Sequence, residues 1–485
     1  MENKYYQSRH FLRLLHRYEK AVSEGHVPYL EADELTDIAE YYMTGKQDAK
    51  ANQAIQAAIN MHPGSVDPQI FLARQKMFYG QLEEARAIVD AITEQEDTEV
   101  TYIRAELLIR ENRADEASAY MLEQMEKKQD SLDTFLHDCT SIFMDYDEWE
   151  LAQEWFERLE ETFPDHPKLP IMEAEILMGL DEYEDALPML QKILDEEPYN
   201  SEAWNLLSET YDALERYADA IEAADDALAI NPQDNNALLM KANAYMHDSQ
   251  METAIEYYKR YLEAQPDDVN VYISLAACYG SRERDKEALQ VLEKAEQYAL
   301  KLPDRNSDLT QVFQMRAYAL GHLNRTSEAL AAIAQARKYG EESEVWKLDM
   351  TEGDIYLHSQ QTKLAEESFV AALAHSPEQS DTLFNIALLY GTAGYYSIAI
   401  DLLNDVWSIT GTQEGKFVVP YIADCYLRKN DMENFLDYLK LSPYCDREAT
   451  EFLFHDRFPG ITPEEYYAYA YKEIHGVFPD NNPNI

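Results

Sequence analysis

Acidic side chains and histidines are the residues of this sequence that are best suited to acid–base or metal chemistry. The chain carries 92 Asp and Glu residues and 12 histidines. Paired carboxylates catalyse proton transfer, but at this density such pairs arise by chance on most exposed helix faces, so we assign none of them a catalytic role. The motifs of phosphate loops, zinc proteases, serine hydrolases and calcium loops do not occur. The sequence therefore predicts no catalytic residue, no metal site and no cofactor.

Charge and composition indicate a folded protein with a strongly acidic surface. Lys and Arg number 41 against the 92 acidic residues, which gives a formal net charge of −51, while 46% of the residues are hydrophobic. This apolar content exceeds that of a disordered acidic tail, so the charge must cover a folded surface. A surface this negative repels phosphate backbones and anionic lipid headgroups. We therefore expect a neutral or basic partner, and neither nucleic-acid nor membrane binding.

The N-terminal segment and the cysteines indicate in which compartment the protein is expected. The N-terminal segment carries charges throughout, and no run of about 18 apolar residues, as a membrane span needs, occurs in the chain. Cys139, Cys278, Cys425 and Cys445 are too few for a disulfide framework and form no C-x-x-C pair. We expect a cytoplasmic protein with reduced, mostly buried thiols.

An alanine recurs along the chain with a period near 34 residues. We call these residues the anchors and number the repeats one to twelve after them. The residue twelve positions before each anchor is Ala, Ser, Thr or Gly, and the residue four positions after it is apolar. Independent positions that follow one frame predict paired helices that approach closely at the small residues. The anchors are Ala51, Ala85, Ala117, Ala152, Ala186, Ala220, Ala254, Ala288, Ala329, Ala365, Ala399 and, in the last repeat, Phe435.

The sixth repeat shows the pattern most clearly, with Trp204, Leu207, Tyr211, Ala220 and Pro232. This pattern resembles the tetratricopeptide repeat of bacterial proteins, a pair of helices joined by a turn. The resemblance implies an all-α fold, a right-handed superhelical α-solenoid of about twelve helix–turn–helix repeats with helical caps. It also implies that the first helices line a concave groove that binds a protein segment.

The ends of the array need covering helices. Residues 1–31 are expected to form an N-terminal capping helix, and 446–485 an aromatic C-terminal cap with a helix after Pro463 and a tail. On the N-terminal helix, the side chains expected to face the array are Phe11, Leu12, Leu15, Tyr18 and Val22.

The spacing of the anchors divides the array between the caps. Repeats one to eight occupy 32–300, and repeats nine to twelve occupy 310–445. The anchors of repeats eight and nine are 41 residues apart, so 301–309 is an insertion and a possible hinge. An extended second helix of repeat eight followed by a loop is favoured over a loop broken at Pro303.

Positions 18, 15, 11 and 8 residues before an anchor fall on one face of the first helix, and we call them the groove face. In repeats seven to nine this face is polar but uncharged, and amides there are able to donate to and accept from a peptide backbone. Histidines seven residues before three anchors are expected to line the groove or to complement a helix end, rather than to bind metal. The expected peptide-binding residues are Asn236, Asn243, His247, Asn270, Gln311, Gln314, Tyr318 and His322.

These features favour a non-enzymatic scaffold whose groove holds a protein or peptide segment. Because like charges repel, we expect a monomer or a small oligomer. Two alternatives stay open. One is an enzyme with an unrecognised site in or near the aromatic C-terminal segment 451–476, and the other is a purely structural array that assembles with itself.

Overall fold

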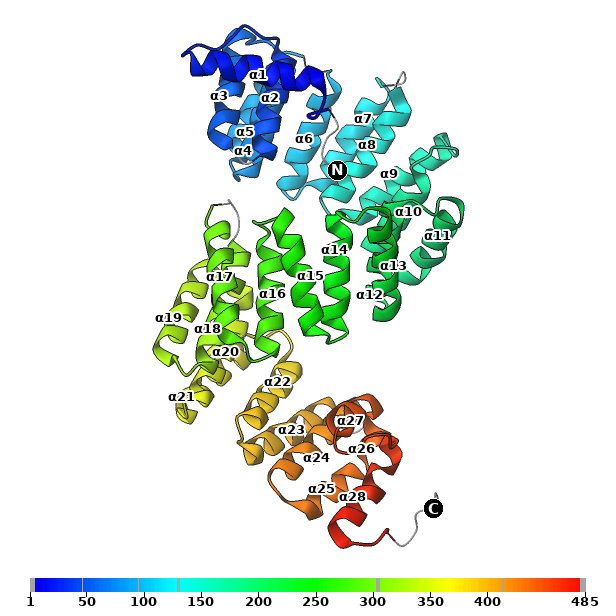
Figure 1. Ribbon diagram of the computed structural model, residues 1–485, viewed down its shortest axis with the longest axis vertical. Helices are drawn as coiled ribbons and strands as arrows, with labels where there is room; N and C mark the ends of the chain where they lie inside the picture. Colours follow the sequence, from blue (N-terminus) through cyan, green and yellow to red (C-terminus); the bar gives the residue numbers. More distant parts are fainter. Residues whose placement is uncertain are drawn as a thin grey trace. The chain divides into compact units, whose positions relative to one another are not determined.

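The computed structural model describes residues 5–45, 47–94, 96–128, 131–301, 306–411 and 414–479. Within these ranges every regular element is a helix, which confirms the all-α repeat fold. The helices follow one another in pairs, and each first helix packs against the second helix of its repeat (Figure 1). The chain forms two compact units that divide between Pro266 and Asp267. We call them the N-terminal unit (α1–α15) and the C-terminal unit (α16–α28).

The N-terminal unit contains a capping helix and repeats one to seven. Its helices are α1 (Arg9–Ser23), α2 (Ala32–Thr44), α3 (Asp48–Met61), α4 (Val66–Phe78), α5 (Leu82–Ala91), α6 (Thr98–Arg110), α7 (Ala114–Met125), α8 (Leu132–Asp145), α9 (Trp149–Thr162), α10 (Leu169–Gly179), α11 (Tyr183–Glu196), α12 (Ser201–Ala213), α13 (Tyr217–Ile230), α14 (Asn235–His247) and α15 (Met251–Ala264).

The C-terminal unit contains repeats eight to twelve and the C-terminal cap. Its α-helices are α16 (Val269–Ser281), α17 (Asp285–Ala299), α18 (Asn306–His322), α19 (Thr326–Tyr339), α20 (Val345–His358), α21 (Thr362–His375), α22 (Gln379–Thr392), α23 (Tyr396–Thr410), α24 (Val419–Arg428), α25 (Met432–Leu439), α26 (Ser442–Cys445), α27 (Arg447–Phe454) and α28 (Tyr466–His475). Short 3-10 turns precede α20, α24 and α28.

The repeat frame predicts burial correctly. Each of the twelve anchors lies in a second helix and is at most 2% exposed. The small residues twelve positions before the anchors and the apolar residues four positions after them are all buried. The two helices of a repeat approach each other closely at the position twelve before the anchor, so only a small side chain fits there. At Gly353 of α20 an added Cβ would lie 2.4 Å from the ring of Phe369 in α21.

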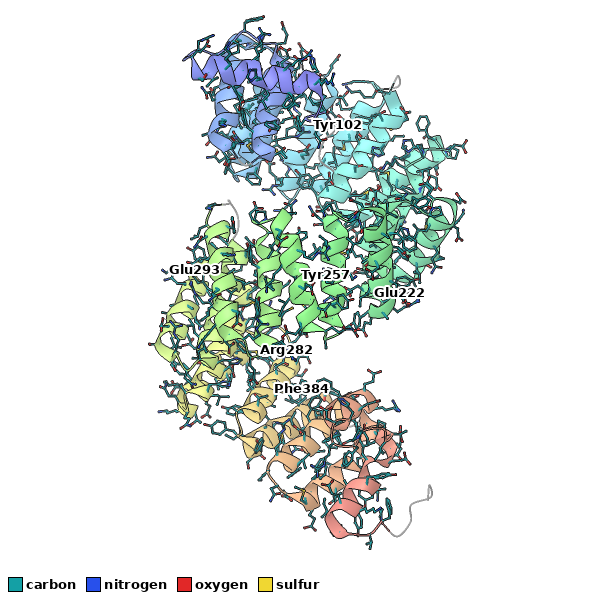
Figure 2. The ribbon with its side chains drawn as sticks, in the orientation of Figure 1. Tyr102, Glu222, Tyr257, Arg282, Glu293 and Phe384 are labelled. Carbon is teal, nitrogen blue, oxygen red and sulfur yellow. The ribbon has the colours of Figure 1, made fainter. Side chains whose placement is uncertain are left out.

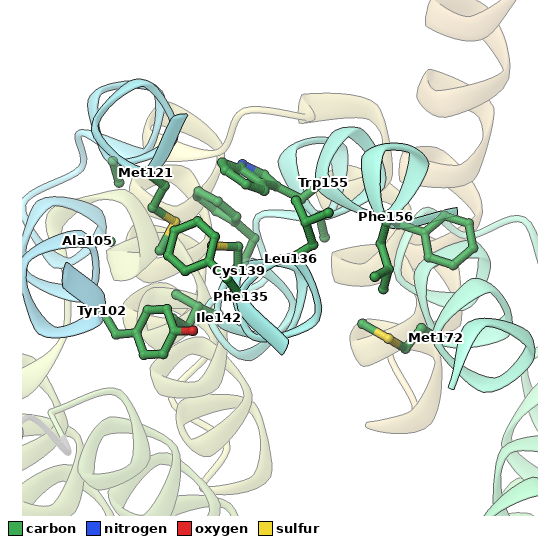
Figure 3. Packing of buried hydrophobic residues seen from close by; sticks show 14 of the residues in the cluster. Tyr102, Ala105, Met121, Phe135, Leu136, Cys139, Ile142, Trp155, Phe156 and Met172 are labelled. Carbon is green, nitrogen blue, oxygen red and sulfur yellow. The ribbon is translucent and has the colours of Figure 1, made fainter. Parts of the chain in front are cut away.

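Neighbouring repeats share their cores. The fully buried ring of Trp155 meets Phe135 edge-on, with the ring centroids 6.4 Å apart (Figure 3). The Nε1 atom of Trp155 donates to Ser118 Oγ at 3.0 Å. Tyr102, labelled in Figures 2 and 3, stacks on Phe135 with the centroids 5.8 Å apart. Because these four residues come from α6, α7, α8 and α9, repeats three and four are stabilised by one common cluster.

A left-handed residue separates the two helices in repeats two to twelve. It stands five positions before the anchor, and Gly80 and Gly394 occupy it in repeats two and eleven with φ of 68° and 87°. In the other nine repeats φ lies between 56° and 62°, a conformation that costs a non-glycine residue about 1 kcal/mol. Those residues are Asn112, Asp147, Asp181, Glu215, Ser249, Glu283, Asn324, Gln360 and Asn430. The equivalent residue of repeat one, Lys46, lies outside the described residues.

Both expected caps are helical. In α1, Phe11, Leu15 and Tyr18 are buried against repeat one and Val22 is half-buried, but Leu12 is 49% exposed and the prediction for it is wrong. Leu14 is buried in its place. It lies three positions after Phe11 and four positions before Tyr18, so all three side chains share one face of the helix.

At the other end, the helix expected after Pro463 is α28. Its Tyr466 packs with Phe454 and Phe458 against α25, so the aromatic residues here form a core. The last six residues, 480–485, lie outside the described residues.

The additional residues around 301–309 extend a different helix from the one expected. α17 has 15 residues and α15 has 14, whereas α18 has 17 and α16 has 13. The expected extension of the second helix of repeat eight is therefore wrong, and the extra helical turn begins α18 at Asn306. Residues 302–305, which include Pro303, lie outside the described residues, and the possible hinge at 301–309 stays a prediction.

Candidate functional site

A pocket of 810 Å³ opens over the groove face of repeats one to three. We call it the α4 pocket. Its floor is apolar, formed by Met43, Ile70, Phe71 and Phe78. Residues at the frame positions that define the groove face provide more than half of its lining. They are Asp33, Thr36, Glu40 and Met43 of α2, Asp67, Ile70 and Arg74 of α4, and Glu99 of α6.

The α4 pocket is acidic. Its carboxylates are Asp33, Asp37, Glu40, Asp67 and Glu99. Arg74 is the one cation among the described lining residues, and its Nη2 lies 3.2 Å from Glu99 and 3.1 Å from Glu106. Tyr6 donates a hydrogen bond to Glu40 at 3.1 Å. Partial burial and the neighbouring carboxylates raise the pKa of Asp67. The pocket therefore holds more negative charge than its own cation offsets.

A second pocket, of 440 Å³, lies beside α10, and we call it the α10 pocket. Met144 and Met178 supply apolar surface, and the indole ring of Trp149 lies against Gly179, where a Cβ would come within 2.1 Å of Trp149 Cδ2. Only glycine at that position permits this contact. Carboxylates arrive from three helices and one turn, and no Lys or Arg is among the described lining residues. They are Asp145 of α8, Glu175 of α10, Asp181 before α11, and Glu209 of α12.

Glu175 is the most perturbed acid in the α10 pocket. Burial first, and then the charge of Glu202, raise its pKa from 4.5 to about 7, while Lys168 acts in the opposite direction. A further pocket of 210 Å³ on its other side contains Lys168, whose Nζ lies 3.9 Å from Glu202. Glu175 thus faces carboxylates while the nearest cation is engaged by another acid.

Neither pocket was predicted from the sequence, because the expected groove residues came from the uncharged repeats seven to nine only. The same spacing counted back from Ala51, Ala85 and Ala117 gives the acidic residues of the α4 pocket, and from Ala186 it gives Glu175. What the sequence did not show was which of the 92 acidic side chains line a pocket together.

The amide residues expected to bind a peptide fall on both compact units. In the N-terminal unit, Asn236 is exposed, whereas Asn243 Oδ1 accepts a hydrogen bond of 2.8 Å from the buried Tyr258. His247 Nδ1 lies 2.8 Å from the carboxylate of Asp212 in α12. Two of the three residues therefore join α14 to neighbouring helices, and Asn236 keeps its side chain exposed on the groove face.

In the C-terminal unit, Asn270 of α16 and Gln311 of α18 are exposed. Gln314 Nε2 donates to Thr351 Oγ1 at 2.9 Å, which joins α18 to α20. The ring of Tyr318 packs on His322 with the centroids 4.2 Å apart. Exposed amides thus alternate with side chains that fasten one repeat to the next.

Two of the three frame histidines come close together. The rings of His322 and His358 have their centroids 5.4 Å apart, and each Nδ1 lies near a buried carboxylate, at 3.5 Å from Asp285 and 3.2 Å from Asp354. The hydrogen bond with Asp354 raises the pKa of His358 to about 8. Within the described residues no group of three His, Cys, Asp or Glu side chains is placed to hold a metal ion.

The three fully buried cysteines and the half-buried Cys445 are all free thiols. Burial raises the pKa of Cys278 and Cys425 to about 11, so neither is a ready nucleophile. In the part of the chain that the structure describes, no helix is long and apolar enough to cross a bilayer.

Successive helix pairs that pack against one another define the class, a helical-repeat scaffold for protein–protein interaction. Residues 171–235, 208–269 and 239–300 match the family model described as tetratricopeptide repeat. These matches together cover residues 171–300, so this part of the chain consists of tetratricopeptide repeats. Proteins with such repeats bind proteins or peptides and are generally not enzymes.

Solved structures with similar helical repeats share little sequence with this chain. A tetratricopeptide repeat protein from Parabacteroides merdae is 16% identical, covering 56% of this chain and 99% of its own, with a TM-score of 0.38. YrrB, described as a TPR protein with an unusual peptide-binding site, is 18% identical over 40% of this chain and 95% of its own, with a TM-score of 0.32. The Cut9–Hcn1 hetero-tetramer of APC/C contains a chain 15% identical over 87% of this chain and 89% of its own, with a TM-score of 0.35. No curated protein matches the sequence.

Proposed function

We propose that this protein is a non-enzymatic scaffold that holds an extended segment of a neutral or basic protein against its groove face. The observation that carries the proposal is the lining of the α4 pocket, where successive first helices contribute the same frame positions. A segment lying along the groove face meets equivalent side chains at every repeat. Pockets that recur at those positions provide binding sites for its side chains.

The exposed amides extend the proposed contact surface. Asn236, Asn270 and Gln311 keep both donor and acceptor groups exposed to solvent, which suits them to the backbone of an extended segment. Asn243 and His247 lie on α14 with Asn236, and Gln314, Tyr318 and His322 lie on α18 with Gln311. We propose that these residues hold each first helix in place within its own unit. Removing one such bond to a bound backbone lowers affinity roughly five- to a hundred-fold.

The net charge of −51 supports the remaining parts of the proposal. It favours a chain that stays monomeric or forms small oligomers, because copies repel one another. It also disfavours nucleic acid and anionic membranes as partners. We propose a cytoplasmic location, which the four free thiols favour.

The test is affinity capture from the native cell with the full chain, followed by quantitative mass spectrometry. Asp67→Lys changes the groove face of the α4 pocket, and Asp226→Lys makes the same charge change on the exposed surface of α13. We expect a protein that is retained by the parent and by Asp226→Lys but reduced at least fivefold by Asp67→Lys. Asn270→Lys combined with Gln311→Lys tests the amide region in the same way. If every captured protein stays bound to both groove variants, the site lies elsewhere.

A further inference from the structure

We propose that the α10 pocket receives a lysine or arginine side chain of the bound segment. This inference rests on the proposed scaffold function and names the chemistry of one subsite within it. It concerns the N-terminal unit alone, because the lining comes from α8 to α12.

The shape of the α10 pocket suits the two halves of a long cationic side chain. Trp149, Met144 and Met178 offer aromatic and thioether surface to the methylene stem, and an indole face also attracts a cation. Glu175 and Glu209 lie beyond that surface as acceptors for the charged head group. An apolar or acidic side chain would contact only the aromatic and thioether surface and would bring no cation to the carboxylates.

The carboxylates that line the α10 pocket repel one another. The groups that face Glu175 are Asp145 and His137 from α8, Asp181 and Tyr183 at the start of α11, Glu202 and Glu209 from α12, and Lys168 at the start of α10. Lys168 is the one Lys or Arg in that set, and it pairs with Glu202. Tyr183 donates its hydroxyl to Asp181 at 3.3 Å. Lys168 offsets the charge of Glu175 only in part, because the pKa of Glu175 stays raised to about 7. No Lys or Arg of the described lining of the α10 pocket adds to that effect, and a ligand cation would.

Binding and proton release are linked through Glu175. With a pKa of about 7, its carboxyl is about half protonated at pH 7. A cation placed beside it favours the ionised form, so about half a proton leaves for each ligand bound at that pH. At pH 6 most of the sites must first lose the proton, whereas at pH 8 few must. The dissociation constant at pH 6 should therefore be about tenfold higher than at pH 8.

The experiment uses the full chain and a fluorescein-labelled dodecapeptide of Gly, Ser, Phe and four Lys residues. A matched peptide with acetyl-lysine at each Lys keeps the stem and removes the charge. Fluorescence anisotropy at 0.15 M salt should detect binding of the Lys peptide alone, with the pH dependence given above. Calorimetry at pH 7 in buffers of different ionisation enthalpy should report the released proton.

Variants separate the pocket from the overall negative charge. Glu175→Gln should weaken binding at pH 8 at least tenfold and abolish the dependence on pH, while circular dichroism checks that the helices remain. Glu209→Gln, at an exposed position of the lining, is a second variant, expected to weaken binding several-fold. Glu222→Gln removes the same charge from the exposed side of α13 (labelled in Figure 2) and should change affinity less than twofold.

Three results would overturn the proposal. Equal losses in Glu175→Gln and Glu222→Gln would show that the peptide responds to net charge. Equal affinity for the Lys and acetyl-lysine peptides would show that no cation is recognised, and it would leave the scaffold function standing. No binding of the Lys peptide at 1 mM would show that the pocket is not a cation receptor. A failure of the scaffold itself would appear instead in the capture experiment, as partners that ignore every groove variant.

Discussion

Glu175→Gln should stabilise the N-terminal unit at pH 8 and change it much less at pH 5. The pKa of Glu175 is raised from 4.5 to about 7, so the folded chain holds the proton more tightly than the unfolded chain does. The cost of ionising Glu175 is therefore small near pH 4.5, grows as the pH rises to 7, and stays constant above. At 1.36 kcal/mol for each pH unit between the two values, the cost at pH 8 is about 3 kcal/mol. Access of solvent to the pocket reduces this to about 2–3 kcal/mol.

Hydrogen exchange measured by mass spectrometry suits this prediction. The stability of a repeat array is a sum of local terms, so peptides from α10 to α12 should report the change while distant helices do not. Parent and variant are compared at the same pH, which cancels the intrinsic exchange rate. The lower limit is pH 5, because the chain loses its net charge near its pI of about 4.4. Glu222→Gln is the control and should stay within about 0.5 kcal/mol at both pH values. A Glu175→Gln effect of the same size at pH 5 and pH 8 would refute the assignment of a raised pKa.

Three further predictions follow from the backbone, the amides and the insertion. Gly394→Ala should lower the free energy of unfolding by about 1–2 kcal/mol, because an added Cβ meets no neighbouring atom and only the left-handed backbone opposes it. Glu283→Gly should raise the free energy of unfolding by up to about 1 kcal/mol. Thermal unfolding measures both, and changes of the opposite sign would contradict the turn geometry. Asn243→Ala should cost about 1 kcal/mol, because it removes the oxygen that accepts the 2.8 Å hydrogen bond from the buried Tyr258 of α15. Asn270→Ala should stay within about 0.5 kcal/mol, and equal costs of the two variants in urea unfolding would contradict the difference in their roles. Limited proteolysis should cleave first within 301–308, and a first cut inside repeats five to seven would remove the hinge assignment.

Burial was predictable from the sequence because it depends on side-chain size at fixed positions in the frame. A position where two helices nearly touch excludes all but small residues, and Thr140, Ser208 and Gly353 satisfy this limit as alanine does. The left-handed turn was not predictable in the same way. Glu215, Glu283 and Gln360 are ordinary helix formers, and nothing in their side chains indicates a positive φ.

The candidate site was predictable only as a face of a helix. The frame predicts which residues lie on the groove face. It does not predict whether an amide on that face bonds within the protein or stays exposed to solvent. Asn243 and Gln314 bond within the protein, whereas Asn236, Asn270 and Gln311 remain exposed. The choice depends on whether a neighbouring helix presents a partner at bonding distance, and that is set by packing across repeats.

Several arginines of the array lie at the turns between helices and do not reach the middle of the first helices. In repeats three, six, eight and nine an arginine four positions before the anchor pairs with the acid one position before it, as Arg216 pairs with Asp219 at 2.6 Å. Arg216 also lies 4.4 Å from the ring centroid of Tyr211, the aromatic residue of the same repeat. These arginines lie at the turn into the second helix, so their charge is used at one end of the repeat. Glu175 and Glu209, in the middle of first helices, gain no such partner, and a cation from another molecule is what their pocket lacks.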